Sequence, residues 1–228
     1  MMNIIKISPA KCNMWLIING DKSILVDAGY SGKINDFEHT LVDNGLKPGD
    51  ISMIFMTHAH FDHACGLRKI KELTRARVVV HENDAGYLGQ GFCPLPKGTK
   101  WYSGFISWLG RNLLYGLGKF EPVSPDIITR SKLDLSRYGM EGYIIPTPGH
   151  TLGSQSLIIN ENAFIGDDMF GIFRNTVLPP FADDLPALLT SWEMLLDTGC
   201  DVYYPGHGKV IERKKIEDEL GKLRNRIN

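Results

Sequence analysis

The sequence lacks the usual marks of export and of nucleic-acid binding. Its four cysteines, Cys12, Cys65, Cys93 and Cys200, form no Cys-x-x-Cys pair and no disulfide framework, so we expect reduced thiols. The N-terminus lacks the charged start, apolar centre and cleavage site of a signal peptide. Lys and Arg number 25 against 26 Asp and Glu, which leaves no overall basic field for nucleic acid. These absences predict a cytoplasmic protein that binds no nucleic acid.

No apolar run is both long enough and clean enough to cross a membrane. The best candidate lies within residues 85–122, where several glycines, Arg111 and Lys119 interrupt a barely sufficient length. A chain of 228 residues suits one domain with a large core. We therefore expect a single domain over residues 1–228, with 85–122 as an insertion that is rich in aromatic residues.

Histidine is also scarce, but three of the seven histidines fall in one six-residue window, residues 58–63. The window reads His-Ala-His-Phe-Asp-His and follows the apolar run 51–56, which is typical of a buried strand. Imidazole and carboxylate are the ligands that zinc, iron and similar divalent ions prefer. His58 and His60 alternate along the extended chain and could hold one ion, whereas Asp62 and His63 could hold a second.

The N-terminal third of the chain alternates strands and helices in the order β-β-α-β-α-β. An Asn-Gly hairpin signal separates the first two strands, and helical spacing of apolar residues marks the helices. The expected elements are strands over 15–18, 24–26, 51–56 and 77–80, and helices over 33–44 and 64–73.

Later strands also end in histidine or aspartate. Tight Pro-Gly or Gly turns place His150, Asp167 and His207 directly after apolar runs. His81 also follows a strand, but it stands alone, so we assign it a structural role; Cys65 is interpreted as a small buried thiol. The remaining expected elements are strands over 143–146, 156–159, 163–165 and 202–204, a helix that Asp183 and Asp184 begin, and a helix over 211–227.

The motif series His-x-His-x-Asp-His, Gly-His, Gly-Asp and Gly-His resembles that of the metallo-β-lactamase superfamily of metallohydrolases. The match extends from the Asp27-Ala28-Gly29 turn to His207 and so covers most of the chain. The resemblance implies a four-layer αββα sandwich of the α/β class. It also implies two metal sites and one carboxylate that bridges them. The first site would be formed by His58, His60 and His150. The second would be formed by Asp62, His63 and His207, and the bridge by Asp167.

The resemblance implies two divalent ions, zinc first, with manganese or iron as alternatives. Two cations about 3.5 to 4 Å apart would lower the pKa of a shared water and give a hydroxide nucleophile. Asp62 and Asp167 would be the catalytic carboxylates, and the substrate an ester, thioester, lactone or phosphoester. The bridging position directly follows glycine, which favours Asp167 over Asp168. Asp27 would orient a ligand or loop, or serve only as a turn residue.

The run Gly-Asp-Asp-Met-Phe that ends at Phe170 is similar to the Gly-Asp-x-x-Phe motif of hydroxyacylglutathione hydrolases (glyoxalase II). Those enzymes grip glutathione with a C-terminal helical domain, and this chain ends soon after His207. Acyl-homoserine lactonases carry a tyrosine at the position of Phe170. Two alternatives to hydrolysis stay open: a mononuclear iron oxidoreductase similar to persulfide dioxygenases, and a metal-bound scaffold without catalysis.

The insertion at 85–122 carries an apolar stripe at helical spacing. It could be a helix packed on the core. It could instead be an apolar lid beside the metal site that binds an apolar small-molecule substrate, a membrane surface or a second subunit in a homodimer. The candidate substrate-pocket residues are Trp101, Phe105, Trp108 and Phe170.

Overall fold

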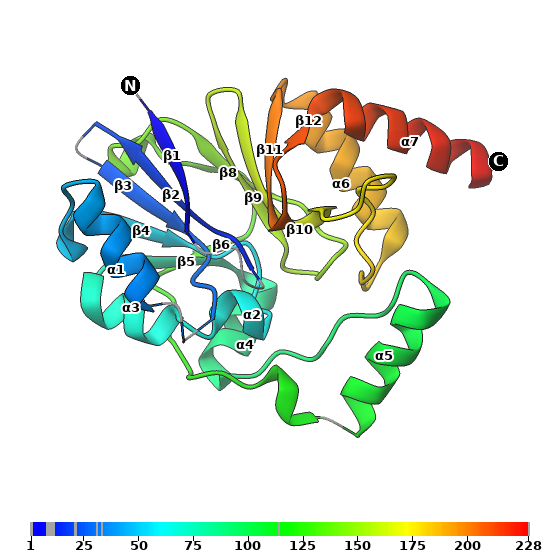
Figure 1. Ribbon diagram of the computed structural model, residues 1–228, viewed down its shortest axis with the longest axis horizontal. Coiled ribbons are helices and arrows are strands. Elements are labelled where there is room, and N and C mark those ends of the chain that lie inside the picture. The colour runs from blue at the N-terminus through cyan, green and yellow to red at the C-terminus, as the bar shows by residue number, and fades with distance from the viewer. Residues whose placement is uncertain are drawn as a thin grey trace.

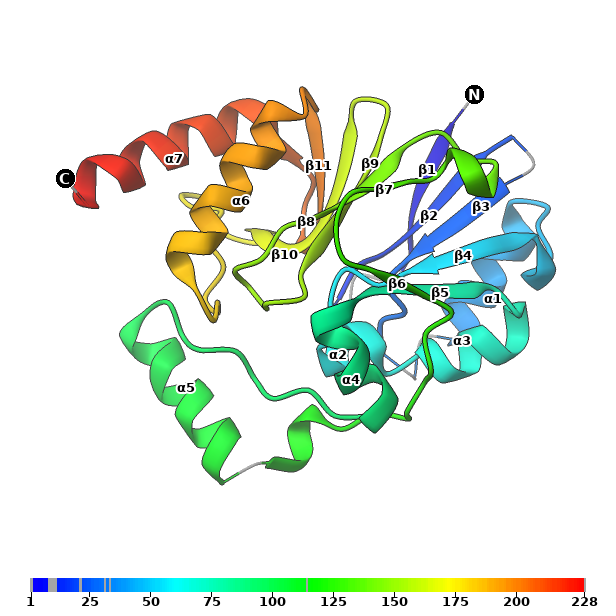
Figure 2. The same cartoon turned by 180° about the vertical axis from the view of Figure 1, so that it is seen from behind.

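The chain folds as two six-stranded sheets that face each other, with helices on both outer faces (Figures 1 and 2). The αββα sandwich expected from the sequence is therefore confirmed. The structure is a computed structural model. It describes residues 2–7, 12–20, 22–30, 32, 34–113 and 115–227.

The N-terminal half forms the first sheet, in the spatial order β1-β2-β3-β4-β5-β6. β1, β2 and β3 pair antiparallel, whereas β3 to β6 run parallel. The carboxyl ends of β3, β4 and β5 therefore meet at one edge of the sheet. The strands are β1 Asn3–Ile7, β2 Met14–Asn19, β3 Lys22–Val26, β4 Ile51–Phe55, β5 Arg77–His81 and β6 Ile127–Thr129.

The C-terminal half forms the second sheet, in the order β12-β11-β10-β9-β8-β7. β10 and β11 run parallel, and the other neighbours are antiparallel. The strands are β7 Leu133–Asp134, β8 Tyr143–Pro146, β9 Gln155–Ile159, β10 Asn162–Gly171, β11 Val202–Gly208 and β12 Ile211–Glu212.

Helices α1 and α3 cover the outer face of the first sheet, and α6 and α7 cover that of the second (Figure 1). Helix α5 stands apart from both sheets in the two views (Figures 1 and 2). The α-helices are α1 Ile34–Asp43, α2 Phe61–Ala64, α3 Leu67–Thr74, α4 Glu82–Gln90, α5 Trp101–Asn112, α6 Leu185–Asp197 and α7 Arg213–Ile227. The 3₁₀ turns are η2 Pro48–Asp50, η3 Tyr115–Gly118 and η4 Ser136–Tyr138.

Three apolar layers hold the sandwich together. Strand β3 shows how one sequence serves two of them: Ile24 and Val26 pack between the sheets, whereas Leu25 packs under the helices of the first sheet. This alternation follows from the two-residue period of a strand. Trp192 of α6 and Tyr203 of β11 belong to the third layer, outside the second sheet. Strands that bury both faces read as continuous apolar runs, which made them easy to predict.

Several predicted boundaries differ from the structure. The strands expected over 163–165 and 202–204 continue to Gly171 and Gly208, so Asp167 and His207 lie on strands and not after them. The helix expected over 64–73 begins only at Leu67, as α3, and Ala64 belongs to the short helix α2. In the turn between them Gly66 lies so close to the Ala28 carbonyl that a Cβ would collide with it. The helix expected over 211–227 starts later, because Ile211 and Glu212 pair with β11 as β12. Strand β1, which pairs with β2 along its whole length, was not predicted.

Candidate metal centre

The seven predicted ligands converge where the strands of both sheets end. His58 and His60 follow β4, and Asp62 and His63 lie on α2. The other three come from the second sheet: His150 follows β8, Asp167 lies on β10 and His207 on β11. Among the described residues, three groups made up only of predicted ligands have ligand atoms within 4.8 Å of one another: His58, His60 and His150; His58, His63 and Asp167; and Asp62, His63 and His207. A fourth group joins His63 to Cys12 and Asp27.

The first group consists of three buried imidazoles. Nδ1 of His60 lies 2.9 Å from Nε2 of His150, and Nδ1 of His150 donates to the carbonyl oxygen of Phe181 at 2.9 Å. A carbonyl oxygen can only accept, so Nε2 of His150 keeps its lone pair. Nδ1 of His58 lies 3.0 Å from Oγ1 of Thr57, so its other ring nitrogen, Nε2, is free to bind a metal. This arrangement suits nitrogen ligands that share one cation.

The second group, Asp62, His63 and His207, joins α2 to β11, and Asp167 on β10 contacts it. Nε2 of His63 lies 3.3 Å from Oδ1 of Asp167. Nε2 of His207 lies 3.3 Å from Oδ2 of Asp62 and also 3.3 Å from Oδ2 of Asp167. Nε2 of His150 is 3.5 Å from the same Asp167 oxygen. Asp167 therefore touches both groups and lies at the position that a shared ligand would occupy.

The charges of the centre are also divided between the two groups. Burial lowers the pKa of His58 well below its usual value and that of His60 to about 3, so both imidazoles stay neutral. Burial also opposes charge on His207, but the carboxylates of Asp167 and Asp62 outweigh it and raise its pKa to about 10. The neutral imidazoles of His58 and His60 provide lone pairs, and the carboxylates of Asp62 and Asp167 provide negative charge, which is what a divalent cation requires.

Buried polar atoms without partners test whether a metal fits. Among the described side chains, four such atoms have no hydrogen bond: His58 Nε2, His63 Nε2, Asp167 Oδ1 and Asp168 Oδ1. Three of the four lie on His58, His63 and Asp167, which form one of the groups given above. Buried polar groups are nearly always satisfied in folded proteins, so orphaned atoms that converge on one place indicate a missing ligand. The donor set of imidazole nitrogens and carboxylate oxygens fits zinc, iron or manganese.

Comparison with known proteins agrees with this geometry. A family model described as the metallo-beta-lactamase superfamily matches residues 7–207. The chain belongs to this superfamily. It is 34% identical over 209 residues to the probable metallo-hydrolase MJ0888 of Methanocaldococcus jannaschii, a match that covers 88% of this chain and 89% of that protein.

Solved structures of the superfamily share the fold. An archaeal member, ST1585 from Sulfolobus tokodaii, superposes with a TM-score of 0.68 at 21% identity, over 98% of this chain and 86% of its own. TTHA1623, solved in a di-iron-bound form, superposes with a TM-score of 0.69 at 22% identity, over 95% of this chain and 98% of its own. The family model and the likeness to MJ0888 support a metallohydrolase of this superfamily, and the solved structures show the shared fold.

Asp27 supports the centre from behind His63. Its Oδ2 accepts from Nδ1 of His63 at 2.8 Å, which fixes the ring so that Nε2 faces Asp167. Asp27 also accepts from the backbone N and the Oγ1 of Thr57, both at 2.8 Å. It adopts a positive φ of 57° in the turn after β3. The residue is therefore both a turn residue and a partner of a predicted ligand.

Sequence reasoning missed a second supporting carboxylate, Asp84. It is buried on α4, where it accepts from the backbone N of Ala59 at 2.8 Å and from Oγ1 of Thr151 at 3.3 Å. Ala59 lies between two predicted ligands and Thr151 directly follows His150, so Asp84 ties two ligand loops together. No spacing in the sequence marks it, because its partners come from distant segments.

Other predicted residues have varied surroundings. The ring of Phe170 lies 4.6 Å from that of His207, beside the centre. Asp168 is buried next to Asp167 but accepts from Ser156 Oγ at 3.1 Å, away from the histidines. His81 begins α4 by accepting from the backbone N of Asn83 at 3.3 Å, a structural role as predicted.

The cysteine prediction was wrong in detail. Cys65 is only half-buried and lies outside the metal-type groups that the described residues form. The thiol beside the centre belongs instead to Cys12, whose Sγ groups with ligand atoms of Asp27 and His63. Burial raises the pKa of Cys12 to about 12, so the thiol stays protonated. No signal in the sequence marks this placement, because Cys12 is far along the chain from the histidine cluster.

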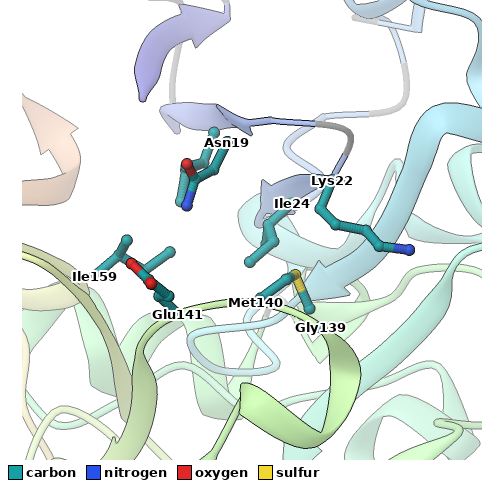
Figure 3. A pocket seen from close by; sticks show the side chains of 8 residues that line it. Asn19, Lys22, Ile24, Gly139, Met140, Glu141 and Ile159 are labelled. Atoms are coloured by element: carbon teal, nitrogen blue, oxygen red, sulfur yellow. The ribbon is translucent and has the colours of Figure 1, made fainter. Parts of the chain in front are cut away.

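A pocket of about 260 Å³ lies at the other end of the sheets, where the β2–β3 hairpin meets the η4 region (Figure 3). Lys22, at the opposite end of β3 from Asp27, points its ammonium group away from the carboxylate of Glu141. Asn19 also lines the pocket, together with Ile24, Met140 and other apolar side chains. Because it holds no convergent ligand groups, we place the chemistry of the protein at the metal centre.

Proposed function

We propose that this superfamily member is a dinuclear metal-dependent hydrolase of an ester, thioester, lactone or phosphoester. The observation that carries the proposal is the set of orphaned buried atoms on His58, His63 and Asp167, in two ligand groups that share one carboxylate. His58, His60 and His150 would hold one ion and Asp62, His63 and His207 the other. We place the enzyme in the cytoplasm, where its free thiols stay reduced.

Divalent ions, when bound, supply Lewis acidity and a water of lowered pKa. The residues of the chain hold and orient this centre. Asp167 contacts both ligand groups, so it can fix their separation. Asp62 contacts the same nitrogen of His207 as Asp167 does, but it is partly exposed and so lies on the solvent side of the site. Phe170 packs against His207 and would limit the space beside the ion that this histidine holds.

Zinc is the metal we expect first, and the di-iron form of TTHA1623 makes iron the main alternative. A mononuclear iron oxidoreductase would not need a second ligand group. The group of Asp62, His63 and His207 is complete, and this favours hydrolysis. A scaffold without catalysis would have no physical need for two groups of metal-type ligands.

The first experiment is elemental analysis of protein purified without added metal, followed by assays of the same sample on p-nitrophenyl ester, thioester, lactone and phosphodiester substrates. Two zinc, manganese or iron ions per chain with turnover of one substrate class would support the proposal. A single iron without hydrolysis would contradict it and favour sulfur oxidation, and absence of metal would favour a scaffold.

Replacing one ligand separates folding from chemistry. We expect His60→Ala to abolish activity and to lower metal content while the chain stays folded, because the imidazole contacts only the centre and its neighbours. His39→Ala, at an exposed histidine on α1, is the matched control and should change neither quantity. Loss of fold in His60→Ala with full metal occupancy would refute the assignment.

We also propose that the 85–122 insertion sets the shape of accepted substrates. Substitution of Trp101, Phe105 or Trp108 should then change the preference between short and long acyl substrates more than it changes metal content. Equal loss on all substrates would contradict this role.

A further inference from the structure

Charge is distributed unevenly around α5. Residues 85–120 contain four of the 25 Lys and Arg residues of the chain and none of its 26 Asp and Glu residues. The four cations are all exposed: Lys97, Lys100, Arg111 and Lys119. The segment therefore carries a net charge of +4, four cations and no carboxylate, in a protein whose formal net charge is −1. Such a local patch attracts anionic partners even when the whole molecule does not.

Helix α5 turns its apolar residues outward. Its inner face carries Ser103, Ser107 and Gly110, which are buried against the extended segment that precedes the helix. Ser107 Oγ donates to the carbonyl oxygen of Pro96 at 2.6 Å, and a Cβ at Gly110 would collide with Leu95. Small residues thus allow close packing inside, and the large side chains are left on the other side.

The outer face of α5 is a continuous apolar surface, which we call the α5 face. Its members fall within an arc of about 160°, at about 100° per residue. Trp101 is 87% exposed, Phe105 63% and Trp108 55%. The full set is Trp101, Tyr102, Phe105, Ile106, Trp108, Leu109 and Leu113. The exposures rule out the expectation that this helix packs on the core.

The α5 face is attached beside the metal centre. The backbone N of Thr99 donates to the carbonyl oxygen of Pro180, and that of Ala182 donates to Lys97. Between these two bonds lies Phe181, whose carbonyl oxygen accepts from Nδ1 of His150. The segment that leads into α5 is therefore held by two backbone hydrogen bonds to residues 180–182, and Phe181 between them contacts the predicted ligand His150.

We propose that the α5 face docks the protein on an anionic lipid surface. Exposed tryptophan and phenylalanine flanked by lysine and arginine are what the boundary between headgroups and acyl chains accepts. No helix among the described residues is long and apolar enough to span a bilayer, so α5 would lie in the interface. Electrostatics disfavour a second copy as the occupant, since two such faces would oppose their cations, and residues 85–120 contain no carboxylate to offset them.

Vesicle binding tests the proposal without an activity assay. Wild-type protein is mixed with vesicles of phosphatidylcholine alone or with phosphatidylserine, then sedimented. We expect binding to the anionic vesicles only, and weaker binding at high salt. Tryptophan emission should shift to the blue on binding, because Trp101 and Trp108 are exposed whereas Trp15 and Trp192 are already buried.

Two double variants assign the binding to the α5 face. Trp101→Ser with Trp108→Ser should abolish binding and the emission shift. Arg111→Gln with Lys119→Gln should weaken binding by about fivefold for each cation that reaches the surface. The matched controls are Val42→Ser, at an exposed apolar residue on α1, and the pair Lys69→Gln with Lys222→Gln, exposed on α3 and α7.

Three results would overturn the proposal. The first is no sedimentation with either vesicle, and the second is equal binding to both, which would remove the role of charge. The third is a wild-type dimer by light scattering that becomes a monomer in the tryptophan variant, without vesicle binding. That result would assign the α5 face to contact between copies.

Discussion

The replacement Asp84→Asn should remove a pH dependence from the stability of the metal-free protein. Burial raises the pKa of Asp84 to about 6, above the ordinary value of 3.8. Asp183 adds to the rise, whereas hydrogen bonds from Ala59, Thr151 and Gly153 oppose it. Between these two values the folded chain keeps a proton that the unfolded chain has released, so stability falls as pH rises through this window.

The size of the effect follows from the shift. About two pKa units at 1.36 kcal/mol each give about 3 kcal/mol between pH 4 and pH 6. Asparagine keeps the shape of the side chain and an oxygen that can accept from the backbone N of Ala59, but it does not titrate in this range. Relative to the wild type, the Asp84→Asn variant should therefore gain about 3 kcal/mol as pH rises from 4 to 6 and no more above pH 7.

Urea unfolding of both proteins at several pH values, after treatment with a chelator, measures this difference. Subtracting the two curves cancels the titration of the histidines, which both proteins share. Asp43→Asn, at an exposed position at the end of α1, controls for loss of a distant carboxylate. A difference between wild type and Asp84→Asn that stays constant from pH 4 to pH 7 would refute the reasoning, because it would mean that burial does not hold a proton on Asp84.

Two further substitutions test how the centre is built. A Cβ in Gly206→Ala would collide with Oδ1 of Asp167 and lie 2.5 Å from Cε1 of His63, so we expect metal content to fall while circular dichroism stays native; unchanged metal content would show that the carboxylate can move aside. Asp27→Asn removes the carboxylate that fixes the tautomer of His63, and should weaken metal binding by about 10 to 100-fold in competition with a chelator. Affinity equal to that of the wild type would show that Asp27 serves only the turn.

The predictable parts of this fold are those set by neighbours in the sequence. The run 51–56 is apolar almost throughout because both faces of β4 are covered, and the structure places a strand at Ile51–Phe55. Asp184 accepts from the backbone N of Ala187, as expected of a residue that caps a helix before proline. Each of these signals is complete within a few residues.

The centre was predictable only in part. The order of the histidine and aspartate motifs indicated which residues meet, and the sandwich does bring them together. The residues that support them are a different matter. Asp84 matters because Thr151 lies beside it, 67 positions further along the chain. No local pattern encodes a contact of this kind.

The α5 face shows why an apolar stripe is ambiguous. Helical spacing of Trp101, Phe105 and Trp108 indicates that one side of the helix is apolar, but it does not say which side meets the protein. The small residues Ser103 and Ser107 decide this, because they permit a closer approach than the aromatic rings do. The apolar stripe therefore forms the exposed side of the helix, and the small residues between its members form the side that packs against the protein.

The ligands of the centre stand on backbone that other contacts already fix. His58 follows β4, whose residues pack into the layers on both sides of the first sheet, and Asp167 belongs to β10, which is nearly wholly buried. Side chains held in this way cannot turn outward to satisfy their own polar atoms when no cation is present. Buried polar atoms without hydrogen bonds destabilise the fold, and packing of the core must offset this loss. The same rigid packing keeps the nitrogen and oxygen atoms at a spacing suited to metal ions. The same buried strands therefore both stabilise the sandwich and hold the ligands in position for metal binding.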